Sequence, residues 1–231
     1  MRIGIIGAMA EEIRLLQEVM SEQKAWSEAG VTFISGKIKE QEVVLVQSGI
    51  GKVLAAITTT LLISHYQVDA VINTGSAGGI GPGLQIGDVV LSDKLAYFDA
   101  DVTAFGYEMG QMAGMPLYYQ ADPTLIAKAE KAAKAHGLQT RTGLIVSGDT
   151  FVDNQAKIAM IKSYFPDVLA NEMEGAAIAH VAHQYGVPFV VIRAMSDVGD
   201  ENASVNFDEF ILEAGKHSAE MVIALITELG S

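Results

Sequence analysis

The chain has 231 residues, 50% of them apolar, which is enough for one compact domain over residues 1–231 with a sizeable core. Its 15 Lys and Arg against 28 Asp and Glu leave a net charge of −13, which would repel the phosphate backbone of a nucleic acid. There is no cysteine, and no apolar run approaches the ~18 to 20 residues that span a bilayer, so we expect no disulfide, no cysteine-ligated metal and no membrane partner.

The first apolar run, residues 2–10, resembles a short signal sequence, but it contains two glycines and meets Glu11 and Glu12, so we expect a strand and no cleavage. Along the chain, strand-like runs alternate with helical patterns, which is typical of α/β folds. Strands are predicted at 3–7, 43–47, 70–74, 88–91, 144–146 and 189–194. Helices are predicted at 10–23, 52–65, 123–136, 154–162, 173–185 and 208–229.

The predicted strands are continuous blocks of Val, Ile and Leu, as expected when helices cover both faces of a mostly parallel sheet. Residues 26–47 resemble an antiparallel hairpin after the first helix, so the sheet is predicted to be mixed. The predicted fold class is therefore α/β, with three α/β/α layers around a central mixed, mostly parallel twisted sheet. Residues 99–120 contain no clearly predicted helix or strand, and an irregular segment of that length indicates a functional role.

Ligand sites in open α/β sheets form beyond the carboxyl ends of strands. Four such places are rich in polar residues or glycine: 7–12, 75–79, 171–175 and 196–197. Five glycines within 75–83 would let backbone N–H groups approach a ribose or an anion, although a flexible crossover has the same composition. No dinucleotide fingerprint or Walker motif is present, so neither NAD nor ATP is expected.

Three carboxylates from distant parts of the sequence are candidates for acid–base chemistry. Glu174 begins a predicted helix, where free N–H groups favour an ionised carboxylate that binds sugar hydroxyls; an ordinary helix-start glutamate is the alternative. Asp197 ends an apolar strand, where burial would raise its pKa and make it a proton donor; a turn or N-cap residue is the alternative. Glu12 follows the first strand in the same way.

The other reactive residue types form no recognisable motif. His180 and His183 share a helical face, but no third ligand has metal spacing, so no metal is expected. No nucleophile elbow surrounds a serine, which leaves covalent catalysis without support. The methionines, Met9 among them, either line an adaptable pocket or fill the core.

Five segments together carry a resemblance to a known family. They are the acidic first loop within 4–12, the Asp-Val-Thr-Ala-Phe-Gly-Tyr run within 99–107, the Glu-Met-Glu-Gly run within 172–177, and the segments 73–79 and 193–197. Nearly end to end, the chain resembles the 5′-methylthioadenosine/S-adenosylhomocysteine nucleosidases of the nucleoside phosphorylase superfamily. The resemblance implies a nucleoside phosphorylase-like fold and a bacterial, cytoplasmic homodimer. It also implies hydrolysis of adenine nucleoside thioethers, and of 5′-deoxyadenosine, to adenine and the 5-substituted ribose, in methionine salvage and methyl-cycle detoxification.

The resemblance assigns a catalytic role to each candidate carboxylate. Asp197 would protonate adenine N7, which makes adenine a neutral leaving group. Glu174 would hold the ribose 2′-hydroxyl and stabilise the developing cation. Glu12, with Ser76 and Arg193, would orient the attacking water, and no metal or other cofactor would take part.

The resemblance also assigns residues to the parts of the substrate. Phe151 would stack on adenine, the backbone of Val152 would read the edge of the base, and Ser196 would help to position Asp197. The other contacts expected within the same chain are Met9, Ile50, Ser76, Gly78, Met173, Arg193 and Phe207.

The 5′ substituent of such substrates is apolar. Ile50 and Phe207 would line its pocket, and Val102 and Phe105 of the partner subunit would complete it, which gives the long segment 99–120 a purpose. Ala113 stands where relatives often have Pro, so the preference among 5′ groups stays open.

Three alternatives remain at this point. A phosphorolytic enzyme of the same fold would use phosphate in place of water, but Glu11 and Glu12 in the first loop would repel it. A futalosine or AMP nucleosidase would act on a related substrate, although apolar 5′ residues disfavour a phosphorylated end. A non-catalytic nucleoside-binding module would bind without turnover, but it has no need of a positioned acid.

Overall fold

The computed structural model describes residues 1–200 and 202–230, so Glu201 and Ser231 of the predicted domain lie outside the described residues. The helices are α1 (Ala10–Val19), α2 (Lys52–Tyr66), α3 (Pro123–Ala135), α4 (Gln155–Tyr164), α5 (Gly175–Tyr185) and α6 (Ala203–Leu229), with a short 3-10 helix, η1 (Thr103–Phe105). The strands are β1 (Arg2–Gly7), β2 (Ser21–Glu28), β3 (Val31–Ile38), β4 (Gln41–Gln47), β5 (Ala70–Gly79), β6 (Val89–Tyr97), β7 (Tyr119–Gln120), β8 (Thr140–Ser147), β9 (Val168–Glu172) and β10 (Phe189–Asp197).

The ten strands of the described residues form one mixed sheet. β1 lies between β4 and β5, parallel to both, and β10 runs parallel to β5. β10 also pairs with β6, and β8 and β9 lead from β6 back to β5, so these five strands close into a ring. The antiparallel strands β3 and β2 extend the sheet beyond β4. Closure of the ring brings the carboxyl ends of β5, β9 and β10 together.

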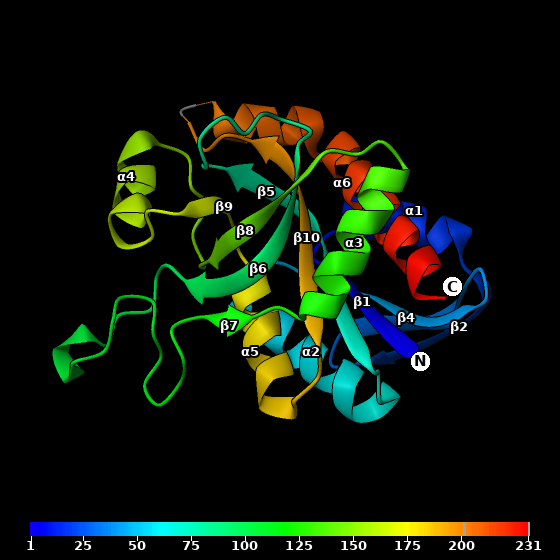
Figure 1. Cartoon of the computed structure of the whole chain (residues 1–231). Helices are drawn as coiled ribbons and strands as arrows, with labels where there is room; N and C mark the ends of the chain where they lie inside the picture. The colour runs from blue at the N-terminus through cyan, green and yellow to red at the C-terminus, as the bar shows by residue number, and fades with distance from the viewer. Residues whose placement is uncertain (201, 231) are drawn as a thin grey trace.

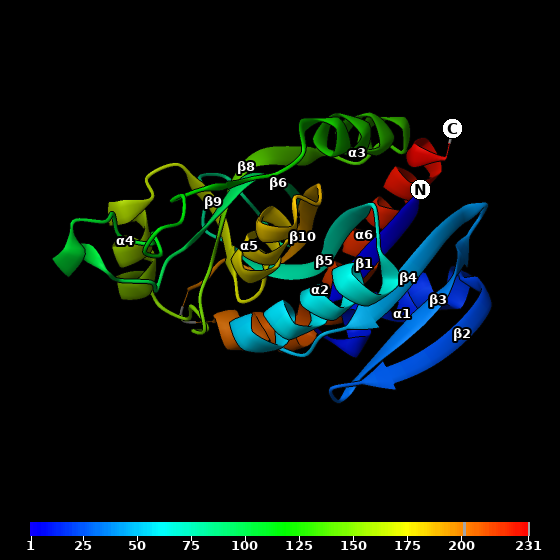
Figure 2. The same ribbon diagram turned by 90° about the horizontal axis from the view of Figure 1, so that it is seen from below.

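Helices cover both faces of the sheet, as its apolar strands predict (Figures 1 and 2). α2 and α5 pack on one face, where Leu62 and Ile178 join the core. α1, α3 and α6 pack on the other face, where Leu16, Leu125 and Leu225 are buried. The three-layer α/β architecture is therefore confirmed.

Several predicted boundaries are wrong, two of them because strand pairing overrides the local pattern. The helix predicted at 10–23 ends at Val19, since the next residues pair with β3 as strand β2 and turn the predicted hairpin into a three-stranded meander. β5 continues through Gly79, so the first part of the glycine-rich stretch is strand and not loop. The last helix begins at Ala203 instead of residue 208, and no prediction covers β9.

The segment between β6 and β7 projects from the body of the protein (Figures 1 and 2). As its sequence predicts, it holds little regular structure beyond η1, and 81% of the surface of Phe105 is exposed there. None of the helices in residues 1–200 and 202–230 has the length and apolarity that crossing a membrane requires.

Candidate active site

A cavity of about 300 Å³ opens where the carboxyl ends of β1, β5, β9 and β10 meet the starts of α5 and α6. Most of the predicted site residues line this cavity: Met9, Glu12, Ile50, Ser76, Gly78, Phe151, Val152, Met173, Glu174, Ser196, Asp197 and Phe207. Residues to which the sequence analysis assigns no role line it as well: Ala8, Ala77, Thr150, Asn171, Glu172, Ser204 and Asp208. The ring of strands thus converts residues scattered along the chain into one site.

Glu12 is buried in the first turn of α1, where its carboxylate joins the loop after β1 to strand β5. Its Oε2 accepts hydrogen bonds from the N–H groups of Ala8 at 2.8 Å and Met9 at 3.1 Å. Its Oε1 accepts from the N–H of Ser76 at 2.9 Å and from the Ser76 hydroxyl at 3.0 Å. Gly75 has no room for a side chain, because a Cβ there would lie 2.6 Å from Glu12 Oε1. Glu12 and Ser76 are therefore held side by side at the cavity wall.

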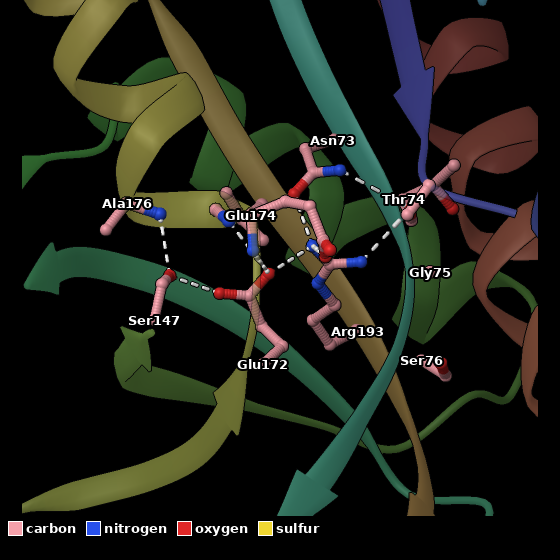
Figure 3. A network of polar contacts seen from close by, with 12 residues as sticks. Asn73, Thr74, Gly75, Ser76, Ser147, Glu172, Glu174, Ala176 and Arg193 are labelled. Atoms are coloured by element: carbon pink, nitrogen blue, oxygen red, sulfur yellow. Dashed lines mark hydrogen bonds and ion pairs between the residues drawn. The ribbon is translucent and has the colours of Figure 1, made fainter. Parts of the chain in front are cut away.

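Arg193, for which we predicted a substrate contact, is fully buried on β10 and is not among the residues that line the cavity. Its guanidinium donates to Asn73 Oδ1 at 2.6 Å, to the Thr74 carbonyl at 3.2 Å and to Glu172 Oε2 (Figure 3). Burial opposes its charge, but Glu172 and Glu174 hold the pKa of Arg193 above its ordinary value. Arg193 therefore remains a cation and acts on the site through its neighbours.

Glu174 differs from the expectation that a helix start keeps it ionised. It is the N-cap of α5, yet the N–H groups of Glu174 and Gly175 donate to Glu172 Oε2, at 2.9 and 2.8 Å. The Glu174 carboxylate accepts instead from the Gly51 N–H at 2.8 Å, and its Oε2 lies 3.7 Å from Arg193. Burial, together with the negative charge of Glu172, outweighs these contacts and raises the pKa of Glu174 to about 8.

Asp197 ends β10 beside a β-bulge, and only 3% of its surface is exposed. The Ser196 hydroxyl donates to its Oδ2 at 3.0 Å, and the Gly199 N–H donates to its Oδ1 at 2.8 Å. Burial nevertheless raises the pKa of Asp197 above its ordinary value, as the sequence analysis predicts. The side chain therefore suits a proton donor better than a surface aspartate does.

The rest of the cavity wall is largely apolar. Phe151 and Phe207 meet edge to face with their ring centroids 5.9 Å apart, and Val152, Met173 and Ile50 line the same space. A cavity lined by aromatic and aliphatic side chains together with polar groups suits a flat, neutral ring joined to a hydroxylated unit.

Two predicted residues, Val102 and Phe105, do not line the cavity of their own chain; they lie in the projecting segment. The residue that sequence reasoning missed is Glu172, which bonds both Arg193 and the start of α5. The sequence does contain a hint of this role, because Glu172 and Glu174 both lie just before the helix and either carboxylate could accept hydrogen bonds from its first N–H groups.

Comparison with known proteins shows the superfamily to which the chain belongs. The sequence model of the phosphorylase superfamily matches residues 2–228, which is nearly the whole chain.

The relatives narrow this class. The chain is 50% identical over 229 residues to the 5′-methylthioadenosine/S-adenosylhomocysteine nucleosidase of Actinobacillus succinogenes, covering 99% of this chain and 100% of the relative. The S-adenosylhomocysteine nucleosidase of Streptococcus pyogenes, in complex with 5-methylthiotubericidin, superposes with a TM-score of 0.97 at 48% identity, over 99% of this chain and 97% of the other. The futalosine hydrolase of Helicobacter pylori gives 0.94 at 32% identity, over 98% and 97%. The chain belongs to the 5′-methylthioadenosine/S-adenosylhomocysteine nucleosidase family of the phosphorylase superfamily.

Proposed function

We propose that this chain hydrolyses the N-glycosidic bond of 5′-methylthioadenosine, S-adenosylhomocysteine and 5′-deoxyadenosine, releasing adenine and the 5-substituted ribose. The names of the Actinobacillus and Streptococcus relatives support this substrate class. The reaction would serve methionine salvage and methyl-cycle detoxification in the cytoplasm, and no step of it calls for a metal or another cofactor.

The charge of the cavity supports water, and not phosphate, as the attacking group. Five carboxylates line it: Glu12, Glu172, Glu174, Asp197 and Asp208. Among the described residues of the lining none is Lys or Arg, and the guanidinium of Arg193 behind it is already bonded to Glu172. A phosphate dianion would therefore find no cationic side chain in the lining and would face Glu12 and Glu172 in a poorly solvated space, whereas a neutral water needs no counter-charge.

Asp197 would deliver the proton that lets adenine leave. Its carboxyl is buried, and burial raises its pKa, so it can hold a proton and donate it to N7 of a base seated against Phe151. Adenine then departs as a neutral molecule, and the ribose becomes an oxocarbenium-like cation without any covalent nucleophile.

Glu174 would stabilise that cation most strongly at the transition state. With its pKa raised to about 8, it is largely neutral at pH 7 before substrate binds. A 2′-hydroxyl donating to it, and positive charge developing nearby, both favour the ionised form. The interaction therefore strengthens as the bond breaks, which is the condition for raising the rate and not merely the affinity.

Glu12 and Ser76 would hold the attacking water. Within residues 1–200 and 202–230, the Glu12 carboxylate accepts four hydrogen bonds, from Ala8, Met9 and Ser76, and three of these donors are fixed backbone N–H groups. Only the Ser76 hydroxyl can rotate, so a water would enter by taking its place on Glu12 Oε1.

We also propose that a second copy of the chain completes the pocket for the 5′ substituent, with Val102 and Phe105 of the partner subunit beside Ile50 and Phe207. The exposed apolar surface supports this homodimer. Besides Phe105, the side chains of Val53, Leu54 and Ile57 on α2 are exposed, and apolar patches of this kind mark protein interfaces.

The decisive experiment is incubation with 5′-methylthioadenosine, with and without phosphate, followed by identification of both products. Adenine with free 5-methylthioribose in the absence of phosphate is expected. A phosphate requirement with a sugar 1-phosphate would establish phosphorolysis. Binding of adenosine analogues without adenine release would establish a binding module, and release from futalosine or AMP alone would assign the other nucleosidase activities.

A further inference from the structure

Glu172 is a buried carboxylate that the proposed chemistry does not use. It is the last residue of β9, lines the cavity and exposes only 3% of its side chain. A charge in such a place is costly unless its partners are well arranged, so its contacts indicate what it does.

The two oxygens of Glu172 fix the first turn of α5 (Figure 3). Oε2 accepts from the N–H groups of Glu174 at 2.9 Å and Gly175 at 2.8 Å, which otherwise lack partners at a helix start. Oε1 accepts from the hydroxyl of Ser147, and the Ser147 oxygen in turn accepts from the Ala176 N–H at 2.7 Å. Three successive N–H groups are thus held by Glu172 and its serine partner.

The same carboxylate takes the hydrogen bond of Arg193, which lies within ion-pair distance of Glu174 but does not hydrogen-bond to it. Arg193 bonds directly to Glu172 Oε2, while its distance to Glu174 Oε2 is 3.7 Å, too long for a hydrogen bond. With Arg193 engaged by Glu172, the carboxylate of Glu174 bonds to the Gly51 N–H and lines the cavity.

We propose that Glu172 is a positioning residue for the hydrolysis: one buried carboxylate fixes the backbone of Glu174, occupies Arg193 and so leaves the Glu174 side chain free for the sugar. This inference rests on the proposed function, because the sugar contact of Glu174 belongs to it.

The charge of Glu172 also affects when Glu174 ionises. Besides burial, which raises the pKa of Glu174 most, four groups in the described part of the chain act on it. Glu172 from β9 and Glu12 from α1 raise the pKa, whereas Arg193 from β10 and the Gly51 N–H before α2 lower it. Neutralising Glu172 removes a like charge and lets Arg193 hydrogen-bond to Glu174, from which it now lies 3.7 Å away. Both changes lower the pKa of Glu174, so the variant should become active at lower pH.

The test compares Glu172→Gln with wild type in the pH dependence of kcat/KM for adenine release. In wild type kcat/KM should rise with pH as Glu174 ionises. In Glu172→Gln this rising limb of the pH profile should move down by about one pH unit or more, because the loss of the negative charge of Glu172 and the closer approach of the positive charge of Arg193 both lower the pKa of Glu174. Turnover at the optimum should fall by about tenfold or more through loss of alignment. Glu172→Asp keeps the charge, so its limb should stay at the wild-type position although its turnover falls.

Asp122→Asn is the matched control. Asp122 caps α3 by accepting from the N–H groups of Thr124 and Leu125, both at 2.9 Å, but does not line the cavity. It should leave the pH limb in place. An unmoved limb in folded Glu172→Gln, or an equal shift in the control, would overturn the inference.

A second measurement does not need turnover. The side-chain carboxyl carbon of Glu174, assigned by its loss in Glu174→Gln, is titrated by ¹³C NMR in wild type and in Glu172→Gln, and its midpoint should fall in the variant. A failed activity assay with a shifted midpoint would reject the proposed reaction alone, and an unshifted midpoint would reject the role of Glu172.

If Glu172→Gln does not fold, Ser147→Ala replaces it as the test. This variant keeps every charge but removes the hydrogen-bond partner of Glu172 Oε1 and of the Ala176 N–H. We expect kcat/KM to fall by about tenfold with the rising limb of the pH profile unmoved. Wild-type kcat/KM in Ser147→Ala would overturn the inference.

Discussion

Replacing Glu174 by Gln should make the protein more stable and less active at once. In the folded chain the pKa of Glu174 is raised from 4.5 to about 8, because burial and Glu172 disfavour its charge. The folded state therefore binds this proton more tightly than the unfolded state, and the stability it contributes is present below pH 4.5 and lost as pH rises toward 8. From about pH 5 to about pH 7.5 this one group removes about 3 kcal/mol from the free energy of unfolding.

The assay is urea unfolding of wild type and Glu174→Gln across that pH range, at one fixed protomer concentration. Gln keeps an oxygen for the Gly51 N–H but does not titrate, so its advantage over wild type should grow by about 3 kcal/mol as pH rises. The exposed Glu18, changed to Gln, is the control for the same substitution on the surface, and the pH dependence of Glu174→Gln is compared with it. A constant difference for Glu174→Gln would refute the view that Glu174 is neutral in the folded protein at pH 7. Adenine release by the same variant should fall strongly, since the charge opposite the ribose cation is gone.

Three further substitutions test the other proposed roles. Asp197→Asn should slow adenine release by about 10²- to 10⁴-fold, whereas calorimetry should show nearly unchanged binding of a non-hydrolysable analogue; wild-type turnover would remove Asp197 as the acid. Glu12→Gln replaces an oxygen that accepts two hydrogen bonds by an NH₂ group, so the free energy of unfolding should fall by about 2 kcal/mol or more and activity should be lost. Unchanged stability in urea would contradict the four hydrogen bonds that the Glu12 carboxylate accepts in the structure. Phe105→Ala should leave the circular dichroism spectrum unchanged and raise KM for 5′-methylthioadenosine, and an unchanged KM would argue against a pocket shared between subunits.

The sequence predicts the layers of the fold well because buried strands are continuous apolar blocks, as in β1, β4, β5 and β10. It does not predict the closed ring, which depends on pairings between distant residues such as Gly78 with Asn171. β9 is missed for a related reason: it has only five residues and ends in Asn171 and Glu172, so its local pattern resembles a helix start more than a strand.

The site was predictable to the extent that it follows strand ends. Glu12, Ser76 and Asp197 each come after or at the end of an apolar block, so the rule for carboxyl ends of strands gathers them correctly. The distribution of hydrogen-bond donors was not predictable. Both Glu172 and Glu174 adjoin one helix start, and only the three-dimensional path of β9 into α5 decides that Glu172 takes its N–H groups.

The number of donors explains how chemically similar carboxylates divide the work of one cavity. Among the described residues, Glu12 and Glu172 each accept four hydrogen bonds. Asp197 accepts two, and the Glu174 carboxylate accepts one. The pKa values of Glu174 and Asp197 are raised, because burial disfavours their charge more than these few hydrogen bonds favour it. We therefore propose that Glu174 and Asp197 change protonation during the reaction. Glu12 and Glu172 hold the backbone, Ser76 and Arg193 in place.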